Sequence, residues 1–322
     1  MKKLVNGALA AVMCLYLLPL DALAARQLIP VGKVVGLELR NDTVSVAAFD
    51  DVTGTAAKEA GLQIGDEILN IDGVSVDDAD DVRNALEQSD GRISLRVLRG
   101  KTEHDLSVTP AITEDGPRLG VYLRQGVTGI GTVTWYDPET GDFGTLGHGV
   151  SDPKGALVEM TSGKVYSASV LSVKRGKCGE PGQLRGGVDG AAALGSLEKN
   201  TLRGVFGCAD TGWQGKTMHT ASVDEIETGP ATICSTVSGD RVQEYSVEIL
   251  KIYPNSKADG RNMLLRVTDP ALLAATGGIV QGMSGSPIIQ DGKLVGAVTH
   301  VLVNDPTTGY GIFIDNMLDA AA

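Results

Sequence analysis

Two serines, Ser284 and Ser286, stand among glycines in the segment GMSGSP, a setting that can support covalent chemistry. Apolar, β-branched runs flank this segment, and the sequence QDGK after it is typical of a hairpin turn. Because glycine adopts backbone conformations closed to other residues, the segment predicts a tight loop. Such a loop can present a serine hydroxyl while its own N–H groups converge on an oxyanion. The chemistry indicated is nucleophilic attack by serine, and the alternative is a glycine-rich turn with incidental serines.

A serine nucleophile needs a general base, and histidine is the usual one because its pKa lies near neutrality. His148, in the segment FGTLGHGVSD, ends an expected strand between two glycines, so its ring can lie exposed in a cleft. His300 lies on the strand that follows the serine loop and is expected close in space, with burial as its alternative role. His104 and His219 have no comparable setting, so His148 is the predicted base.

The imidazole of such a base is oriented best by a buried carboxylate. Asp269, in the segment LLRVTDPALL, ends an apolar strand shortly before the serine loop. Asp189, in the segment GGVDGAA, is the second candidate, while Asp152 can equally be a turn residue. Spacing along the chain does not separate Asp269 from Asp189.

Composition narrows the class of protein. The 322 residues include 42 glycines and only 4% aromatic residues, which favours a turn-rich, largely β construction. Lys and Arg number 28 against 40 Asp and Glu, and a net charge of -12 without a basic stripe argues against a nucleic-acid partner. The histidines and cysteines show no close-spaced ligand pairs, so we expect no metal and no other cofactor.

The N-terminus has the plan of a secretory signal. Lys2 and Lys3 precede an apolar run from Leu4 to Leu20, and the small residues after it predict cleavage behind Ala24. An uncleaved membrane anchor is the alternative, because the run lies at the lower limit for a membrane span. Either way, residues 1–25 predict that the remainder of the chain is exported.

Residues 26–111 form an expected module of their own. Strands are predicted at KVVGLEL and at TVSVAAF, with RND as the turn between them. The string AAKEAGLQIGDEILNIDGVSV resembles a bacterial PDZ domain, a fold that binds extended peptide ends by adding them to a sheet edge. The segment around Val35, Gly36 and Leu37 is the loop that we expect to hold the peptide carboxylate. A PDZ fold without a free groove is the alternative.

Residues 112–322 carry many short strand patterns and no long helical one. The polar segment ITEDGPR at 112–118 predicts a linker to this part of the chain. Further on, GPATICSTV and VQEYSVEILKIY flank the turn residues SGDR and predict a hairpin. Strands at this spacing imply a β-sandwich or a β-barrel.

The serine and histidine segments carry a family resemblance. GMSGSP followed by GKLVGAVTH looks like the G-x-S-G-G-P loop and following strand of chymotrypsin-like serine proteases. The segments FGTLGHGVSD and TGGIVQGMSGSPIIQDGKLVGAVTHVLVNDPTTGYGIFI, with the LIP stretch from Leu28, more closely resemble the stage IV sporulation protein B family of serine peptidases. The resemblance implies a mainly β fold, with an N-terminal PDZ domain (26–111) followed by a chymotrypsin-like double β-barrel protease domain (112–322).

The same resemblance implies a role for each matching residue. The serine of the G-x-S-G-S-P loop is Ser284, the nucleophile, and the histidine of the L-G-H-G motif is His148, the base. The aspartate of the T-D motif is Asp269, so the family favours it as the orienting acid. The N–H groups of Gly282 and Ser284 would form the oxyanion hole, and Ser286 would belong to the loop turn.

The biology that the resemblance implies is specific. Family members are exported into the space between the two forespore membranes, cleave themselves, and cut an extracytoplasmic regulator of a membrane-embedded metalloprotease. That step leads to late sigma-factor processing in sporulation. Their PDZ domain is expected to restrain the protease and to recognise a peptide C-terminus or the protein's own terminus, and the substrate is a protein at a membrane surface.

Two other functions remain open for this sequence. One is a quality-control protease of the HtrA kind, although in those enzymes the PDZ domain follows the catalytic domain and glycine stands where this chain has Ser286. The other is an inactive protease fold that serves as a PDZ adaptor. The presence of Ser284, His148 and Asp269 together argues against the adaptor.

Overall fold

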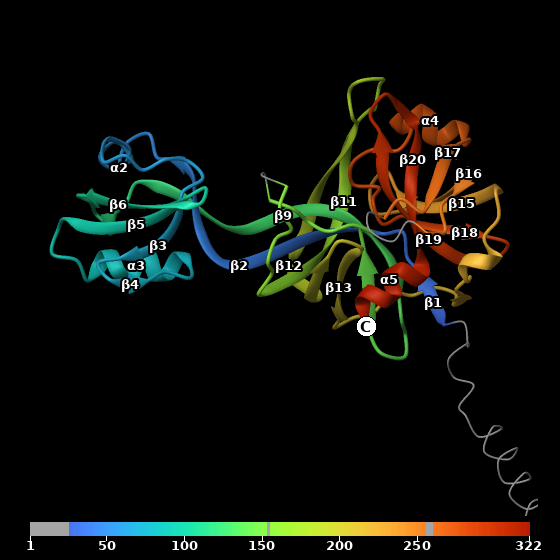
Figure 1. Cartoon of the computed structure of the whole chain (residues 1–322), viewed down its shortest axis with the longest axis horizontal. Helices are drawn as coiled ribbons and strands as arrows, with labels where there is room; N and C mark the ends of the chain where they lie inside the picture. The colour runs from blue at the N-terminus through green and yellow to red at the C-terminus, as the bar shows by residue number, and fades with distance from the viewer. Residues whose placement is uncertain (1–25, 153–154, 256–259) are drawn as a thin grey trace, which may run out of the picture.

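The computed structural model describes residues 26–152, 155–255 and 260–322, and the predicted export segment, residues 1–25, lies outside them. The described chain is mainly β, as predicted. A small domain at one end of the molecule is joined by two long strands to a larger body (Figure 1). Across the described ranges, no helix is both long and apolar enough to cross a lipid bilayer.

The first barrel of the larger body is a closed ring of antiparallel strands. In order around the ring they are β2 (Val34–Phe49), β9 (Val121–Tyr136), β10 (Asp142–Thr145), β13 (Gly204–Ala209), β12 (Gln183–Thr201) and β11 (Ser162–Lys174). The pairing of β2 with both β11 and β9 closes the ring. Outside it, β1 (Gln27–Pro30) is held between β9 and β14 (Met218–His219).

The second barrel is also closed. Its strands, in order, are β15 (Gly229–Thr236), β16 (Val242–Ile252), β17 (Met263–Val267), β20 (Asp305–Phe313), β19 (Lys293–Leu302) and β18 (Pro287–Gln290). The hairpin predicted from the SGDR turn is β15 and β16. A 3-10 turn, η2 (Val223–Glu225), precedes the barrel, and the helices α4 (Pro270–Thr276) and α5 (Ile314–Ala321) follow β17 and β20.

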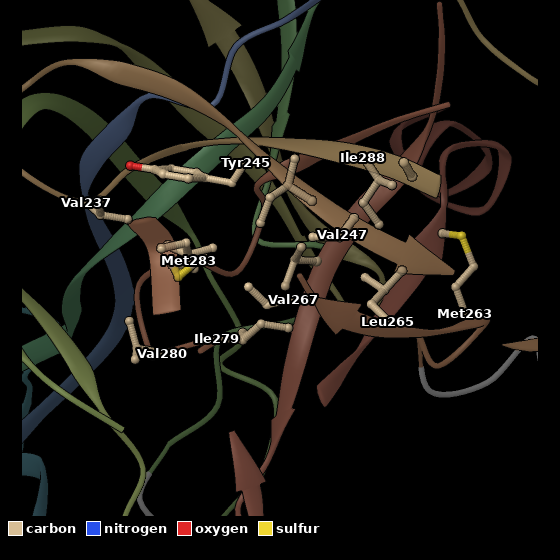
Figure 2. Close-up of a cluster of buried hydrophobic side chains, with 14 of the residues drawn as sticks. Val237, Tyr245, Val247, Met263, Leu265, Val267, Ile279, Val280, Met283 and Ile288 are labelled. Atoms are coloured by element: carbon tan, nitrogen blue, oxygen red, sulfur yellow. The ribbon is translucent and has the colours of Figure 1, made fainter. Parts of the chain in front are cut away.

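Alternating apolar residues fill the second barrel. Val247 of β16, Leu265 of β17 and Ile288 of β18 point into one cluster (Figure 2). Met283, from the loop before β18, belongs to the same cluster and is fully buried. Burying a methionine side chain stabilises by about 1.5–3 kcal/mol. The loop that carries Ser284 is therefore anchored in the core by the residue immediately before it.

The small domain has the strands and the two helices expected of a PDZ domain. Its sheet contains the outer half of β2, β3 (Glu67–Ile71), β4 (Val74–Ser75), β5 (Ile93–Arg99) and β6 (Thr102–Val108). The helices α2 (Thr55–Glu59) and α3 (Ala79–Glu87) pack their buried residues on this sheet. The predicted linker at 112–118 instead forms a small hairpin of β7 (Ala111–Thr113) and β8 (Gly116–Arg118).

The two domains are not consecutive along the chain, which corrects the predicted division into 26–111 and 112–322. Residues 29–39 pair with strands of the first barrel, while residues 121–125 of β9 pair with the PDZ half of β2. The PDZ domain is thus inserted between two neighbouring strands of the first barrel (Figure 1).

One long strand explains the insertion. The segment RND was predicted as a turn, but β2 runs through it as a single strand with a register shift between Leu39 and Val44. Gly126 lies opposite this bulge with a φ of +74°, a conformation that glycine adopts without strain. Partners on neighbouring strands therefore outweigh the local preference of RND for a turn.

The predicted carboxylate loop is wrong for the same reason. Val35, Gly36 and Leu37 lie inside β2, where β11 pairs on one side and β9 on the other. Gly36, for example, lies opposite Tyr166 and Ile130. A backbone that is paired on both sides has no free N–H groups to offer a peptide end.

Candidate active site

Ser284 lies on a tight loop between the segment 277–281, which follows α4, and β18. Gly282 and Gly285 flank this loop with φ values of +98° and +96°, in the region that favours glycine. A Cβ at Gly285 would overlap the carbonyl oxygen of Thr132 in the first barrel, so no larger residue fits there. The two glycines and the buried Met283 together place Ser284 at the junction of the barrels.

The N–H groups of this loop divide into two sets. Those of Gln281, Met283, Gly285 and Ser286 donate to backbone carbonyls of Gly182, Val280, Val298 and Met283. Within the described residues, no acceptor lies within hydrogen-bond reach of the N–H of Gly282 or of Ser284. These are the two groups predicted for the oxyanion hole, and both belong to residues that line the same pocket.

His148 reaches that pocket from the first barrel. The chain leaves β10 through Leu146 and Gly147, whose φ values are +68° and +67°. Such a backbone costs energy for a leucine, and it turns the chain so that the following imidazole faces the second barrel. His148 and Ser284 line one cavity of about 500 Å³ between the two barrels. The ring of His300 also lines this cavity, with its centroid 5.3 Å from that of His148.

The imidazole of His148 is in the form that a general base needs. Its Nδ1 lies 2.9 Å from the carbonyl oxygen of Gly149, and because a carbonyl only accepts, Nδ1 carries the hydrogen. Nε2 is then the nitrogen that can accept a proton. Burial lowers the pKa of His148, and the Gly149 hydrogen bond only partly offsets this effect. His148 is therefore neutral at pH 7.

The serine hydroxyl has a partner of its own in this conformation. Ser284 Oγ donates to the carbonyl oxygen of Thr299, at 2.7 Å. For proton transfer to His148, this hydroxyl must turn away from Thr299 toward Nε2. The second serine of the loop is buried, and its Oγ donates to the carbonyl of Met283 and lies 3.0 Å from Ser235 Oγ. Ser286 thus supports the loop turn.

The structure does not bring Asp269 to this pocket. One carboxylate oxygen accepts from the N–H groups of Ala271 and Leu272 at the start of α4, and the other accepts from Ser246 N. Asp269 is the N-cap of α4, with proline at the first helical position, a combination that is favoured at helix starts. In this structure Asp269 therefore caps α4 and does not orient the imidazole of His148, the role that was predicted for it.

Asp189 does not reach the pocket either. Its Oδ1 accepts a hydrogen bond from Ser169 Oγ, on the neighbouring strand β11. The residues that line the cavity include neither aspartate, within the part of the chain that the structure describes. The carbonyl of Gly149 is the group that holds Nδ1 of His148 here.

Removing the cap should reveal the role of Asp269. Asp269→Ala leaves N–H groups of α4 without an acceptor, and we expect a loss of about 0.5–2 kcal/mol of stability. Asp269→Asn should keep most of the stability, because asparagine is an equally good N-cap. Urea unfolding measures both. If the Asn variant also keeps its peptidase activity, Asp269 acts as a cap alone; a loss of about 10⁴-fold in kcat at full stability would assign it the orienting role.

Asn200 is a supporting residue that the sequence did not suggest. Its carboxamide accepts from Val150 N at 2.9 Å and donates to the carbonyls of Val150 and Val158, at 2.8 and 2.9 Å. These bonds hold the chain two residues beyond His148 against β12. An amide that both donates and accepts fits this place, whereas a carboxylate only accepts.

A second groove lies on the PDZ domain. It has a volume of about 620 Å³ and an apolar floor. Val82 and Leu86 come from α3, Val121 and Leu123 from the start of β9, and Leu119 from just before it. In this stretch β9 pairs with β2 on one side only. A strand edge beside a helix is where PDZ domains add a peptide strand.

The loop at the head of this groove is the candidate that the structure offers in place of the predicted carboxylate loop. Gly120 has a φ of +74°, and a Cβ there would overlap the carbonyl oxygen of Thr53. The signal was present in the sequence as RLGVYL from Arg118, directly after the segment taken for a linker. The polar residues before RLGVYL favoured a linker there, and the VVGLEL segment was the predicted carboxylate loop instead.

Two family models match this chain. A model of the SpoIVB peptidase family S55 matches residues 115–318, more than half of the chain, and a PDZ domain model matches residues 52–99. The chain belongs to the SpoIVB peptidase S55 family. As an S55 member it is a PDZ-containing serine endopeptidase, which confirms the predicted family, fold and enzyme class.

Other similarities of this S55 peptidase are short or distant. Tight junction protein ZO-3 of Homo sapiens is 41% identical over 64 residues, which is 19% of this chain and 7% of ZO-3, so the chain spans a small part of that relative. The PDZ domain of the SdrC-like protein Lmo2051 of Listeria monocytogenes is 21% identical, with 26% of this chain and 87% of that chain covered and a TM-score of 0.22. The active form of the Rv3671c protease of M. tuberculosis is 15% identical, with 74% and 82% covered and a TM-score of 0.34.

Proposed function

We propose that this S55 peptidase is exported into the space between the forespore membranes, cleaves itself, and cuts an extracytoplasmic regulator of a membrane-embedded metalloprotease. The observation that carries the peptidase chemistry is the cavity shared by His148, Ser284 and the N–H groups of Gly282 and Ser284, for which the described residues provide no acceptor. Membership of the S55 family supports the signalling role in sporulation.

The proposed reaction gives each of these groups a role. Ser284 Oγ attacks the peptide carbonyl and passes its proton to His148 Nε2, while the N–H groups of Gly282 and Ser284 hold the oxyanion. The imidazolium then gives the proton to the leaving amine, and an ester remains on Ser284. Water, deprotonated by His148, hydrolyses that ester and regenerates the serine.

Self-cleavage is proposed on the N-terminal side of Gln27. The sequence favours the stretch between Ala24 and the first predicted strand of the PDZ domain for self-cleavage, but β1 occupies part of this stretch. Leu28 and Ile29 of β1 are buried, and both neighbouring strands pair with it. A peptide bond inside β1 can enter an active site only if the strand is pulled out, so the bonds before it are the better substrates.

The PDZ groove is the proposed site for the C-terminus of a protein partner. The last described residues of this chain do not occupy it, because α5 packs on the larger body (Figure 1). Lys199 Nζ donates to the carbonyl oxygens of Ala321 and Ala322, at 2.7 and 2.8 Å. We propose that the groove binds the C-terminus of another protein or a terminus created by cleavage.

The full chain tests this function in a spore-forming host. A Ser284→Ala allele should leave the N-terminus untrimmed, the extracytoplasmic regulator intact and the late sigma factor unprocessed. An otherwise identical Ser286→Ala allele should support all three steps. If the Ser284→Ala allele allows sigma-factor processing at the normal rate, the signalling proposal is wrong; if purified wild-type protein instead degrades unfolded proteins broadly, the HtrA-like function is favoured.

A further inference from the structure

We propose that Thr132, on β9 of the first barrel, is a positioning residue whose hydroxyl fixes the oxyanion hole of the serine loop. The inference rests on the proposed endopeptidase chemistry at Ser284 and names a further residue that serves the same site. Within the part of the chain that the structure describes, Thr132 is not among the residues that line the cavity. Its contribution to the reaction must therefore pass through residues 282–284 of the loop.

The two donors of the oxyanion hole belong to two different peptide groups. In a trans peptide the N–H and the C=O point in opposite directions, so a partner for the carbonyl also orients the N–H. The carbonyl of Gln281 accepts from a backbone N–H of β12 at 2.8 Å, which orients the N–H of Gly282. The carbonyl of Met283 accepts from the N–H and the Oγ of Ser286, which orients the N–H of Ser284 in the same way.

One peptide group lies between these two, and Thr132 holds it. Its carbonyl, that of Gly282, accepts a hydrogen bond from Thr132 Oγ1 at 2.8 Å. Its N–H, that of Met283, donates to the carbonyl of Val280 at 3.1 Å. Gly282 has a φ of +98°, and a glycine has no side chain that would restrict the rotation of this group. The hydroxyl of Thr132 therefore fixes the orientation of the group that separates the two donors.

Thr132 is itself held in place, because it is fully buried and bonded to both catalytic segments. Its N–H donates to the carbonyl of Ser284 at 3.1 Å. Its own carbonyl accepts from Thr145 Oγ1 at 2.6 Å and from Leu146 N at 3.3 Å, and Leu146 begins the turn that leads to His148. A single residue of the first barrel thus connects the serine loop with the segment that presents the base.

Removing this hydroxyl should lower kcat and leave KM nearly unchanged. In Thr132→Val a methyl group replaces the hydroxyl at nearly the same volume, and the carbonyl of Gly282 loses its partner. That carbonyl can gain water as a partner by turning toward the cavity, which Gly282 lines, and this turn moves the donors on both sides of it. Misplaced donors weaken the binding of the transition state more than that of the substrate, so we expect kcat to fall by about 10–100-fold.

Thr134 provides a matched control on the same strand. It is also fully buried, and its Oγ1 donates to the carbonyl of Gly285 at 2.8 Å. That peptide group carries the N–H of Ser286, which donates to the carbonyl of Met283 and is not a donor of the oxyanion hole. Thr134→Val should therefore lower the midpoint of urea unfolding about as much as Thr132→Val does, yet keep kcat within about threefold.

Peptide hydrolysis and urea unfolding of the full chain would compare the wild type with Thr132→Val, Thr132→Ser and Thr134→Val. Thr132→Ser keeps the hydroxyl and should retain kcat within about threefold. A wild-type kcat in a folded Thr132→Val protein would overturn the inference. So would an equal loss of kcat in Thr132→Ser, since the hydroxyl would then not matter, or in Thr134→Val, since any bond between the barrels would then have the same effect. If Thr132→Val does not fold, Thr132→Ala, which removes the hydroxyl without adding a methyl group, takes its place.

A spectroscopic measurement separates positioning from a general loss of structure. A fluorophosphonate adduct of Ser284 places a phosphoryl oxygen at the oxyanion hole, and its phosphorus NMR resonance reports the hydrogen bonds that this oxygen accepts. In Thr132→Val the resonance should shift from the wild-type position toward that of the urea-unfolded adduct, whereas Thr132→Ser and Thr134→Val should keep the wild-type position. An unchanged resonance in Thr132→Val would contradict the role of Thr132. A wild type that neither hydrolyses peptides nor reacts with the fluorophosphonate would instead contradict the endopeptidase proposal.

Discussion

Replacing Ser284 by alanine should reduce peptide hydrolysis by about 10⁴-fold or more, while Ser286→Ala should keep it within about tenfold. The two serines lie two residues apart in the same glycine-rich loop, but only Ser284 lines the cavity with His148. Without its hydroxyl no acyl-enzyme forms, and the N–H groups of Gly282 and Ser284 can provide only residual catalysis. Initial rates on a quenched peptide substrate measure both variants.

The Ser286 variant also checks that the loop tolerates a substitution. Removing this buried hydroxyl deprives the Met283 carbonyl and Ser235 of a hydrogen bond, so we expect a loss of about 1–3 kcal/mol in urea unfolding. Ser284→Ala should unfold close to the wild-type midpoint, because its hydroxyl makes one hydrogen bond at the edge of the cavity. If hydrolysis persisted in Ser284→Ala, or disappeared in a folded Ser286→Ala protein, Ser286 and not Ser284 would be assigned as the nucleophile.

The second large effect is expected from His148. His148→Gln removes the group that takes the serine proton, and kcat should fall by about 10²–10⁴-fold. Because glutamine has similar polarity and volume, the fall in kcat would report the loss of proton transfer by the imidazole. His219→Gln is the matched control, since His219 lies on β14 outside the cavity and should leave kcat unchanged. A His148→Gln enzyme with normal kcat would exclude His148 as the base.

The pH dependence gives an independent measure of the same residue. Because burial lowers the pKa of His148, the acid limb of kcat/KM should have its midpoint below about pH 6.5, the ordinary value for histidine. The folded protein binds this proton less readily than the unfolded chain does. Stability should therefore fall as the pH drops from about 6.5 toward the lower folded pKa. His148→Gln should lack this part of the loss in urea unfolding, and a midpoint above 6.5 would contradict the burial of the imidazole.

The sequence correctly predicted those strands and loops whose conformation depends mainly on residues close to them in the chain. Ile93, Leu95 and Val97 alternate with polar residues in the segment RISLRVLRG, a pattern that predicts a half-buried strand. The structure has β5 there, with these three residues buried. The glycines around His148 and Ser284 predicted loops at which functional side chains are exposed, and the structure places both residues in one cavity. In each case, the backbone conformation and the side-chain pattern favour the same outcome.

The predictions were wrong where contacts between residues far apart in the sequence determine the structure. The segment RND is typical of a turn, yet β2 continues through it as one bulged strand, because β11 and β9 pair with the residues that flank it. This places Gly36 in a barrel and not in a PDZ loop. The sequence TDP fits both a triad aspartate and a helix N-cap, and only the contacts of Asp269 with α4 separate them in this conformation. Asn200 forms its bonds across 42 to 50 residues of chain, a separation that no local motif shows.

The most direct measurement is the site of covalent modification by a fluorophosphonate. The purified wild-type chain would be labelled at pH 7.5, digested, and the adduct located by tandem mass spectrometry, with Ser284→Ala and His148→Gln treated alongside. We expect a single adduct on Ser284 in the wild type, none in Ser284→Ala, and strongly slowed labelling in His148→Gln. An adduct on another serine, or equal labelling of all three proteins, would contradict a catalytic centre built from Ser284 and His148.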